Sequence, residues 1–405
     1  MKTELLLSDP SERVQLGFWR LIHLNGFQLR PARIMNLFLK LILFCILCET
    51  VGEAHAATYN WIGRGAGGNA NLWSSKNNWE IGGVPAPGAP AQNDDAVFGT
   101  VGAGSVTPTL TVNSSIQSIL FSGDRPFDFE GNLSLTVDHG IENNSSANQT
   151  FSVATVVLGG DQTWNANSGD LTINSALNDN GHSLVLSDGG FGRSTILKGS
   201  ISGSGSLTFN GSGMLILSGA NTYTGPTTVS GGTLAAIVAG SFGNAASHTS
   251  GLNISGGAVR LGATPTAATI PVTLSGTGTL QANNQSSAWG LLTLAGGSPH
   301  LDLSPGDSGK ITSFSGGLYT AGSLTIDHWS EAANRDQILI NGAINEAFLV
   351  NVNFDGFGLG AKLVDNELIP LSVPEPQTYA YLVCFGVGFA IHSAYRRRAF
   401  YRSRS

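Results

Sequence analysis

Four carboxylates and one arginine gather between positions 124 and 138, and they are the side chains with the clearest potential for chemistry. The group consists of Asp124, Arg125, Asp128, Glu130 and Asp138. Carboxylates with a basic partner are what enzymes that cleave acidic polysaccharides use for acid–base chemistry. The same residue types are also typical of solvated turns, and we favour that second interpretation.

Other motifs for phosphate, metal or nucleophile chemistry are incomplete. The glycine pairs that begin at Gly159 and Gly189 lack the strand, helix and lysine of a phosphate-binding loop. A calcium-binding nonapeptide beginning at Gly189 needs Asp at position 194, which is Ser. The eight histidines are scattered singly, and no Gly-x-Ser-x-Gly elbow occurs. The sequence therefore predicts no catalytic residue, no metal site and no cofactor.

Charge and cysteine usage distinguish a central body from the two ends of the chain. Residues 57–376 contain 22 Asp and Glu against 9 Lys and Arg, a net charge of −13 within a chain whose total is −7. This acidic body is expected to repel nucleic acid. The three cysteines lie outside it, at Cys45, Cys48 and Cys384, so no disulfide or cysteine metal site is expected in the body.

Residues 1–56 have the features of a secretory signal peptide. A cation at Lys40 precedes a short apolar core, and Ala54 and Ala56 form a small-x-small cleavage site, so we predict cleavage after Ala56. Met35 is an alternative start of the protein, because the stretch before it is an unusually long basic region. The apolar core is too short to span a bilayer, which takes ~20 apolar residues.

An uncharged apolar run at residues 379–394 predicts a transmembrane helix near the C-terminus. Residues 378–395 would reach ~27 Å as a helix, enough for the hydrocarbon core of a bilayer. The cluster that closes the run consists of Arg396, Arg397 and Arg398. Such a cluster is expected to keep the C-terminus in the cytoplasm, so the helix would anchor the protein in the membrane.

A Pro-Glu-Pro tripeptide precedes this helix, at Pro374, Glu375 and Pro376. Together with the helix and the arginine cluster it resembles the PEP-CTERM sorting signal, which in that family is recognised by a membrane-embedded exosortase. The resemblance implies that the tripeptide is the recognition site and that residues 373–405 are a sorting segment. The two prolines keep the tripeptide extended and outside the helix, which favours access by a processing enzyme. An ordinary single-pass anchor is the alternative.

The body is built from short apolar segments with the period-2 pattern of a strand. Examples are Leu171-Thr172-Ile173, Leu184-Val185-Leu186, Leu207-Thr208-Phe209 and Leu292-Thr293-Leu294. Strands this short cannot bury a face alone, so they predict stacking into ~12 to 15 turns of ~20 to 25 residues. Within one segment, Leu215 and Leu217 are expected to point inward and Ile216 outward.

Three tryptophans near the start of the body, Trp61, Trp73 and Trp79, predict a cap at residues 57–104, ahead of the repeat region at residues 105–372. Solenoids need such a cap where the stack of strands stops. The alternative is a platform on which sugars stack, because tryptophan faces attract carbohydrate.

The clearest repeat contains LSGANTYTG at residues 217–225 and GGTL at residues 231–234. It closely resembles the autotransporter-associated β-strand repeat, with Pro226 in place of the usual glycine. In that family such repeats form right-handed β-helices displayed outside the cell. The resemblance implies an all-β fold, a right-handed parallel β-helix or β-solenoid, here between an N-terminal signal helix and a C-terminal transmembrane helix.

These features predict an exported, surface-displayed structural or adhesive protein associated with extracellular polysaccharide, in a Gram-negative-type bacterium. It would use the export machinery, be held transiently in the inner membrane, and reach the cell surface or extracellular matrix after processing by an exosortase-type enzyme. A polysaccharide lyase or hydrolase on the same coil is the alternative. A complete autotransporter would need a C-terminal translocator of amphipathic strands, which residues 373–405 do not resemble.

Overall fold

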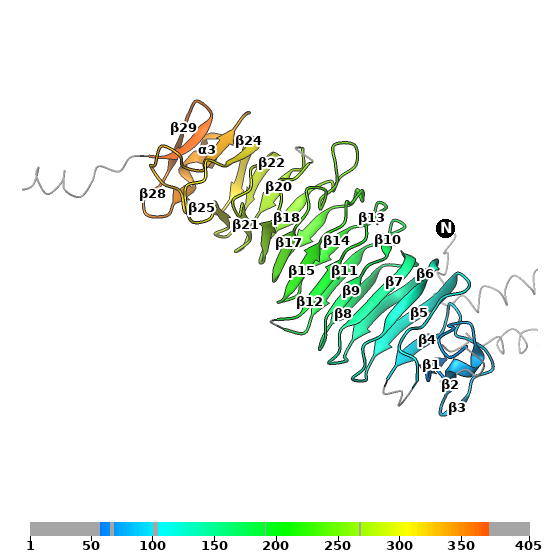
Figure 1. Cartoon of the computed structure of the whole chain (residues 1–405). Coiled ribbons are helices and arrows are strands. Elements are labelled where there is room, and N and C mark those ends of the chain that lie inside the picture. The colour runs from blue at the N-terminus through cyan, green and yellow to red at the C-terminus, as the bar shows by residue number, and fades with distance from the viewer. Residues whose placement is uncertain (1–56, 65–68, 100–103, 191, 267–268, 372–405) are drawn as a thin grey trace, which may run out of the picture. The chain divides into compact units, whose positions relative to one another are not determined.

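The computed structural model describes residues 57–64, 69–99, 104–190, 192–266 and 269–371. These residues form a parallel β-solenoid of about 11 turns with almost no helix (Figure 1). The prediction of an all-β parallel solenoid is therefore confirmed. Within those ranges, no helix is long and apolar enough to cross a bilayer.

Both predicted terminal signals lie outside the described residues. They are the signal peptide with Ala54 and Ala56, the sorting tripeptide Pro374, Glu375 and Pro376, and the cluster Arg396, Arg397 and Arg398. The predictions made for these residues therefore stay predictions.

The chain coils through three parallel sheets. The first sheet contains β1 (Thr58–Trp61), β4 (Asp95–Phe98), the ends of β5 (Ser114–Phe121) and β6 (Asp128–Asn143), β8 (Gln162–Ala166), β11 (Leu184–Asp188), β14 (Leu207–Phe209), β16 (Thr227–Val229), β18 (Leu252–Ile254), β20 (Val272–Leu274) and the ends of β22 (Ser287–Ala295) and β24 (Ile311–Ala321). The second contains the starts of β6 and β7 (Gln149–Leu158), then β9 (Leu171–Ile173), β12 (Ser194–Leu197), β15 (Met214–Leu217), β17 (Thr233–Ala236), β19 (Ala258–Leu261), β21 (Thr279–Gln281), β23 (His300–Asp302), β25 (Leu324–Asp327) and β27 (Val352–Phe354).

The third sheet has strands at both ends of the coil. It contains the start of β5, the middle of β6, the end of β7, β10 (Ala176–Asn178), β13 (Ile201–Ser202), the starts of β22 and β24, and β26 (Gln337–Ile340). In the middle turns, the position of the third sheet is taken by segments without regular strand geometry, which are joined to the next turn by backbone hydrogen bonds. One such bond runs from the Thr222 amide to the Ile201 carbonyl, at 2.8 Å.

Pairing in the second sheet gives the length of a turn. Successive partners there are Leu171, Thr195, Leu215, Leu234, Val259, Leu280, Leu301 and Ile326. A turn therefore takes from 19 residues, between Leu215 and Leu234, to 25 residues, between Leu234 and Val259. The coil has slightly fewer turns than the predicted 12 to 15 because the two ends of the body form caps instead of turns.

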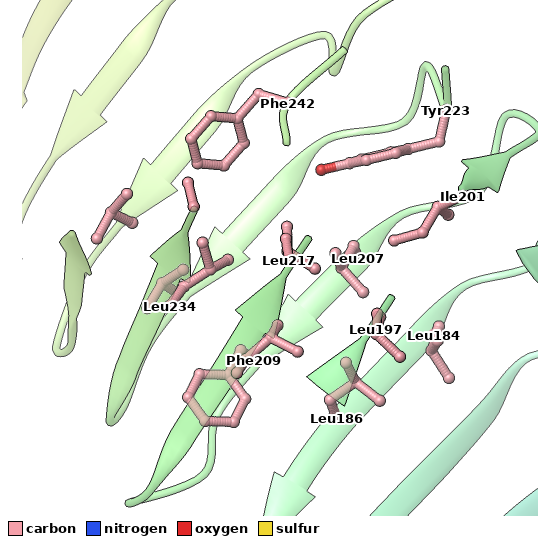
Figure 2. Close-up of a cluster of buried hydrophobic side chains, with 14 of the residues drawn as sticks. Leu184, Leu186, Leu197, Ile201, Leu207, Phe209, Leu217, Tyr223, Leu234 and Phe242 are labelled. Atoms are coloured by element: carbon pink, nitrogen blue, oxygen red, sulfur yellow. The ribbon is translucent and has the colours of Figure 1, made fainter. Parts of the chain in front are cut away.

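Alternating side chains fill the interior of the coil. In β15, Leu215 and Leu217 are fully buried while Ile216 between them is half-exposed, which confirms the predicted inward and outward positions. Figure 2 shows how side chains from successive turns, among them Phe209 and Leu234, gather inside the coil. Burying one such side chain stabilises the fold by about 1.5 to 3 kcal/mol, so the stack and not the single strand is stable.

The LSGANTYTG motif of residues 217–225 supplies polar groups to the same interior. Asn221 joins three turns, because its side-chain oxygen accepts from the Ile201 amide at 2.8 Å and its Nδ2 donates to the Ser241 carbonyl at 2.7 Å. The hydroxyl of Tyr223 lies 2.6 Å from Oγ1 of Thr227. Burial raises the pKa of the Tyr223 hydroxyl well above its usual value.

Antiparallel elements close the N-terminal end of the coil. They are η1 (Lys76–Asn78), β2 (Trp79–Ile81), which pairs with β1, and β3 (Val84–Pro85), which pairs with β2. Trp61, Trp73 and Trp79 are each at most 1% exposed and pack edge to face, with ring centres 5.0 and 4.9 Å apart. No ring face is left for a sugar, so the alternative of a sugar-stacking platform is wrong for these three residues.

The C-terminal end is closed in a similar way. Its elements are α3 (Glu346–Val350), β28 (Gly358–Leu359), β29 (Ala361–Val364) and β30 (Glu367–Pro370). β30 pairs antiparallel with β26, and Arg335 donates to both carboxylate oxygens of Glu367 at 2.9 Å. Antiparallel caps at both ends cover strand edges to which another chain could otherwise pair.

Candidate ligand-binding groove

The carboxylate group singled out in the sequence is divided among different parts of the coil. Asp128 and Glu130 begin β6 in the second sheet, whereas Asp138 lies eight residues beyond Glu130, where β6 bends toward the first sheet. Arg125 precedes the strand and donates to the backbone carbonyl of Gly104 at 2.8 Å. Asp138 therefore lies apart from Asp128 and Glu130 along the strand.

A groove lies instead on the outer side of the first sheet, near the N-terminal cap. It is an open hollow with a volume of about 340 Å³. Its lining residues are Thr58, Asp95, Val97, Ser118, Ile119, Leu120, His139, Gly140, Ile141, Glu142, Thr163 and Asn165. They come from β1, β4, β5, β6 and β8, five strands that neighbour one another in the sheet.

Strand register arranges the outward side chains of the groove in two columns along the coil. The first column is Asp95, Ser118, Gly140 and Thr163, and the second is Val97, Leu120, Glu142 and Asn165. Between the columns lie inward residues such as Ile119 and Ile141, which are buried in the core. The alternation of a β-strand thus brings polar side chains from four successive turns onto one surface.

Hydrogen bonds hold the polar side chains of the groove in place. The Ser118 hydroxyl donates to Oδ1 of Asp95, and Nδ2 of Asn167 donates to Oε1 of Glu142 at 2.9 Å. In the next turn the Ser187 hydroxyl donates to Oδ1 of Asn165. Each of these bonds joins neighbouring turns, so the coil itself fixes the geometry of the groove.

Gly140 keeps the middle of the first column open. Its φ of +153° is one that glycine adopts far more readily than other residues, and a Cβ there would lie 2.3 Å from the Thr163 carbonyl oxygen. A larger residue would therefore displace the next strand. The close pairing of β6 with β8 beneath the groove therefore depends on this glycine.

The groove is acidic. It contains the carboxylates of Asp95 and Glu142 and the imidazole of His139, and none of its lining residues is Lys or Arg. A polyanion would meet two carboxylates without a lysine or arginine to offset them. Hydroxyl, amide and carboxylate groups beside the aliphatic Val97 and Leu120 suit a ligand rich in hydroxyl groups.

A second polar cluster lies on the second sheet near the C-terminal end. His300 Nδ1 lies 2.7 Å from Oδ2 of Asp327, and His328 Nδ1 lies 2.8 Å from Oδ1 of Asp302. The two aspartates are neighbours in the ladder between β23 and β25. In the described part of the chain, no group of three or more His, Cys, Asp or Glu side chains is arranged to hold a metal ion.

Comparison with known proteins supports the repeat region. Residues 207–236 match the family model of the passenger-associated-transport-repeat, and they span β14 to β17 of the coil. No curated protein sequence and no solved structure matches the chain significantly. The chain therefore contains an autotransporter-associated repeat, and this repeat and the solenoid fold fit a passenger-type protein that is exported and displayed at the cell surface.

Proposed function

We propose that the protein is a structural or adhesive component of the bacterial surface that associates with extracellular polysaccharide. The observation that carries the proposal is the passenger-associated repeat within a solenoid closed at both ends. Repeated turns build a long surface from few residue types, and residues 57–376 contain no cysteine. Such a coil suits permanent exposure outside the cell.

Export and sorting follow from the two ends of the chain. Residues 1–56 direct the protein across the inner membrane, with cleavage after Ala56. The helix predicted at residues 379–394 and the arginine cluster then hold the protein in the membrane until an exosortase-type enzyme acts at Glu375 and its flanking prolines.

We also propose that the coil is right-handed, because parallel strand crossovers prefer that hand.

A protease-shaving experiment in a host with an exosortase tests display and sorting together. Protease added to intact cells should remove the wild-type protein, and deletion of residues 1–56 should protect it. Glu375→Ala should be exported yet stay in the inner membrane at full length. The matched control is Glu331→Ala, which removes an exposed carboxylate of the body instead of the sorting tripeptide.

Mass spectrometry of the mature protein gives the decisive readout. Sorting removes roughly the last 30 residues, whereas a plain anchor keeps them. Recovery of a peptide containing Arg404 from surface-exposed wild-type protein would contradict sorting. Protection of the wild-type protein from protease in intact cells would contradict display.

A further inference from the structure

We infer that the groove on the first sheet binds a neutral polysaccharide, and that the chain of this ligand lies along the coil axis. The inference rests on the proposed association with extracellular polysaccharide and names both the class of glycan and the site. Its evidence is the groove itself: two columns of outward side chains that continue over four successive turns.

Glu142 and Asn165 are the main polar pair of the site and end its second column. They are partners in the register between β6 and β8, so a carboxylate and an amide lie side by side. Glu142 uses Oε1 to accept from Asn167, and Asn165 uses Oδ1 to accept from Ser187. Among the described residues, neither Oε2 of Glu142 nor Nδ2 of Asn165 has a hydrogen-bond partner. One acceptor beside one donor is the pattern that two adjacent sugar hydroxyls satisfy.

Asp95 and Ser118 form a second polar pair two turns away, in the first column. The Ser118 hydroxyl donates to Oδ1 of Asp95, and among the described residues Oδ2 of that carboxylate has no hydrogen-bond partner. Val97 and Leu120 stand beside Asp95 and Ser118 in the second column, next to Glu142, and offer an apolar surface to the C–H faces of a sugar ring. The groove thus has polar sites separated along the coil axis, as an extended chain of sugars requires.

Charge selects a neutral glycan over an acidic one. The lining residues include Asp95 and Glu142 but no Lys or Arg, and the body as a whole carries 22 acidic residues against 9 basic ones. Uronic acids or sulfated sugars would bring like charges together inside the groove, which costs binding free energy. Neutral sugars use the same carboxylates only as hydrogen-bond acceptors.

A basic peptide is less well matched than a sugar. Extended peptides bind sheets mainly by adding a strand to an exposed edge, whereas the groove lies on the face of a sheet whose strands already pair on both sides. The groove presents side chains and not backbone donors. A sugar needs only side-chain contacts.

Affinity electrophoresis of the detergent-solubilised full chain tests the inference. Native gels contain dextran, mannan or laminarin as neutral probes, polygalacturonate as the anionic probe, or polylysine as the basic one. At least one neutral polymer should slow the wild-type protein, and the other two classes should not. Asn165→Ala should weaken the binding about 3- to 10-fold, and Glu142→Ala about 10-fold or more. The matched control is Asn253→Ala, an outward asparagine of the same sheet beyond the groove.

Several outcomes would overturn the inference. They are binding to polygalacturonate or polylysine alone, no binding to any neutral polymer, and equal binding by the Asn165 and Asn253 variants. If circular dichroism shows that Asn165→Ala has not folded, Asn165→Ser, which keeps a hydroxyl donor, is tested in its place. Surface display is measured separately by protease shaving, so a displayed protein that binds polygalacturonate but no neutral polymer refutes only this inference. A glycan-binding protein that stays inside the cell refutes only the proposed function.

Discussion

Removal of the Asn221 side chain should reveal how much one amide contributes to stacking three turns. Asn221 is 2% exposed, accepts from the Ile201 amide and donates to the Ser241 carbonyl. Asn221→Ala leaves both backbone groups inside the coil without a partner. An unsatisfied buried polar group costs about 1 to 3 kcal/mol, so the two together cost about 2 to 6 kcal/mol.

Thermal unfolding followed by circular dichroism measures this cost. For a domain of about 150 to 250 residues, about 1 kcal/mol shifts the melting temperature by ~2 to 4 °C, so on this scale Asn221→Ala should lower it by ~4 to 24 °C. The control is Asn253→Ala, whose side chain points outward from β18 and whose loss should cost less than about 0.5 kcal/mol.

A second substitution separates the two hydrogen bonds of Asn221. Asn221→Asp keeps an acceptor for the Ile201 amide but has no hydrogen to donate to the Ser241 carbonyl, and it adds a buried charge. It should therefore destabilise the coil at least as much as Asn221→Ala does. Equal melting temperatures for the Asn221→Ala and Asn253→Ala proteins, or a neutral Asn221→Asp, would refute the role assigned to this residue.

Further predictions concern the same repeat. Leu217→Asp should cost several kcal/mol because it places an unpaired charge in the core, whereas Ile216→Thr should cost far less, and equal shifts of the melting temperature would contradict the assigned faces. Gly225→Ala should destabilise the coil, because the new Cβ would lie 2.0 Å from the Gly205 carbonyl oxygen; a urea midpoint equal to wild type would count against this close packing. The folded state keeps the Tyr223 hydroxyl neutral, whereas in the unfolded chain this group ionises near pH 10. The contribution of Tyr223 to the free energy of unfolding is therefore present below pH 10 and is lost as the pH rises above it. Tyr223→Phe should make the free energy of unfolding, measured by urea titration at pH 9 to 11, less dependent on pH.

Much of the coil could be read from local patterns. The alternation around Ile216 predicts a strand with Leu215 and Leu217 inside, and the structure has that arrangement because side-chain direction in a strand has a period of 2. The same reasoning predicts many short stacked strands, since three-residue segments cannot bury a face alone. These properties depend on residues that are neighbours in the chain.

The roles of individual motif residues depended on the tertiary structure. LSGANTYTG is recognisable as a repeat, but nothing in its letters shows that Asn221 bonds to residues 20 positions before and after it. The tryptophans of the cap are equally ambiguous, because a buried ring and a sugar platform need the same residue type. Only packing decides which ring faces are covered.

The groove is the feature that the sequence alone did not reveal. Its polar residues, from Asp95 to Asn165, stand in four different turns and share no motif, and the one signal they carry is an outward place in the alternation. Which of them become neighbours depends on strand register. Because turn lengths vary between 19 and 25 residues along the second sheet, register is set by corners, bulges and buried side chains together. The sequence by itself therefore determined that the body consists of short strands and which side chains point into or out of the coil. The stacking of the turns decided which outward side chains become neighbours on the surface.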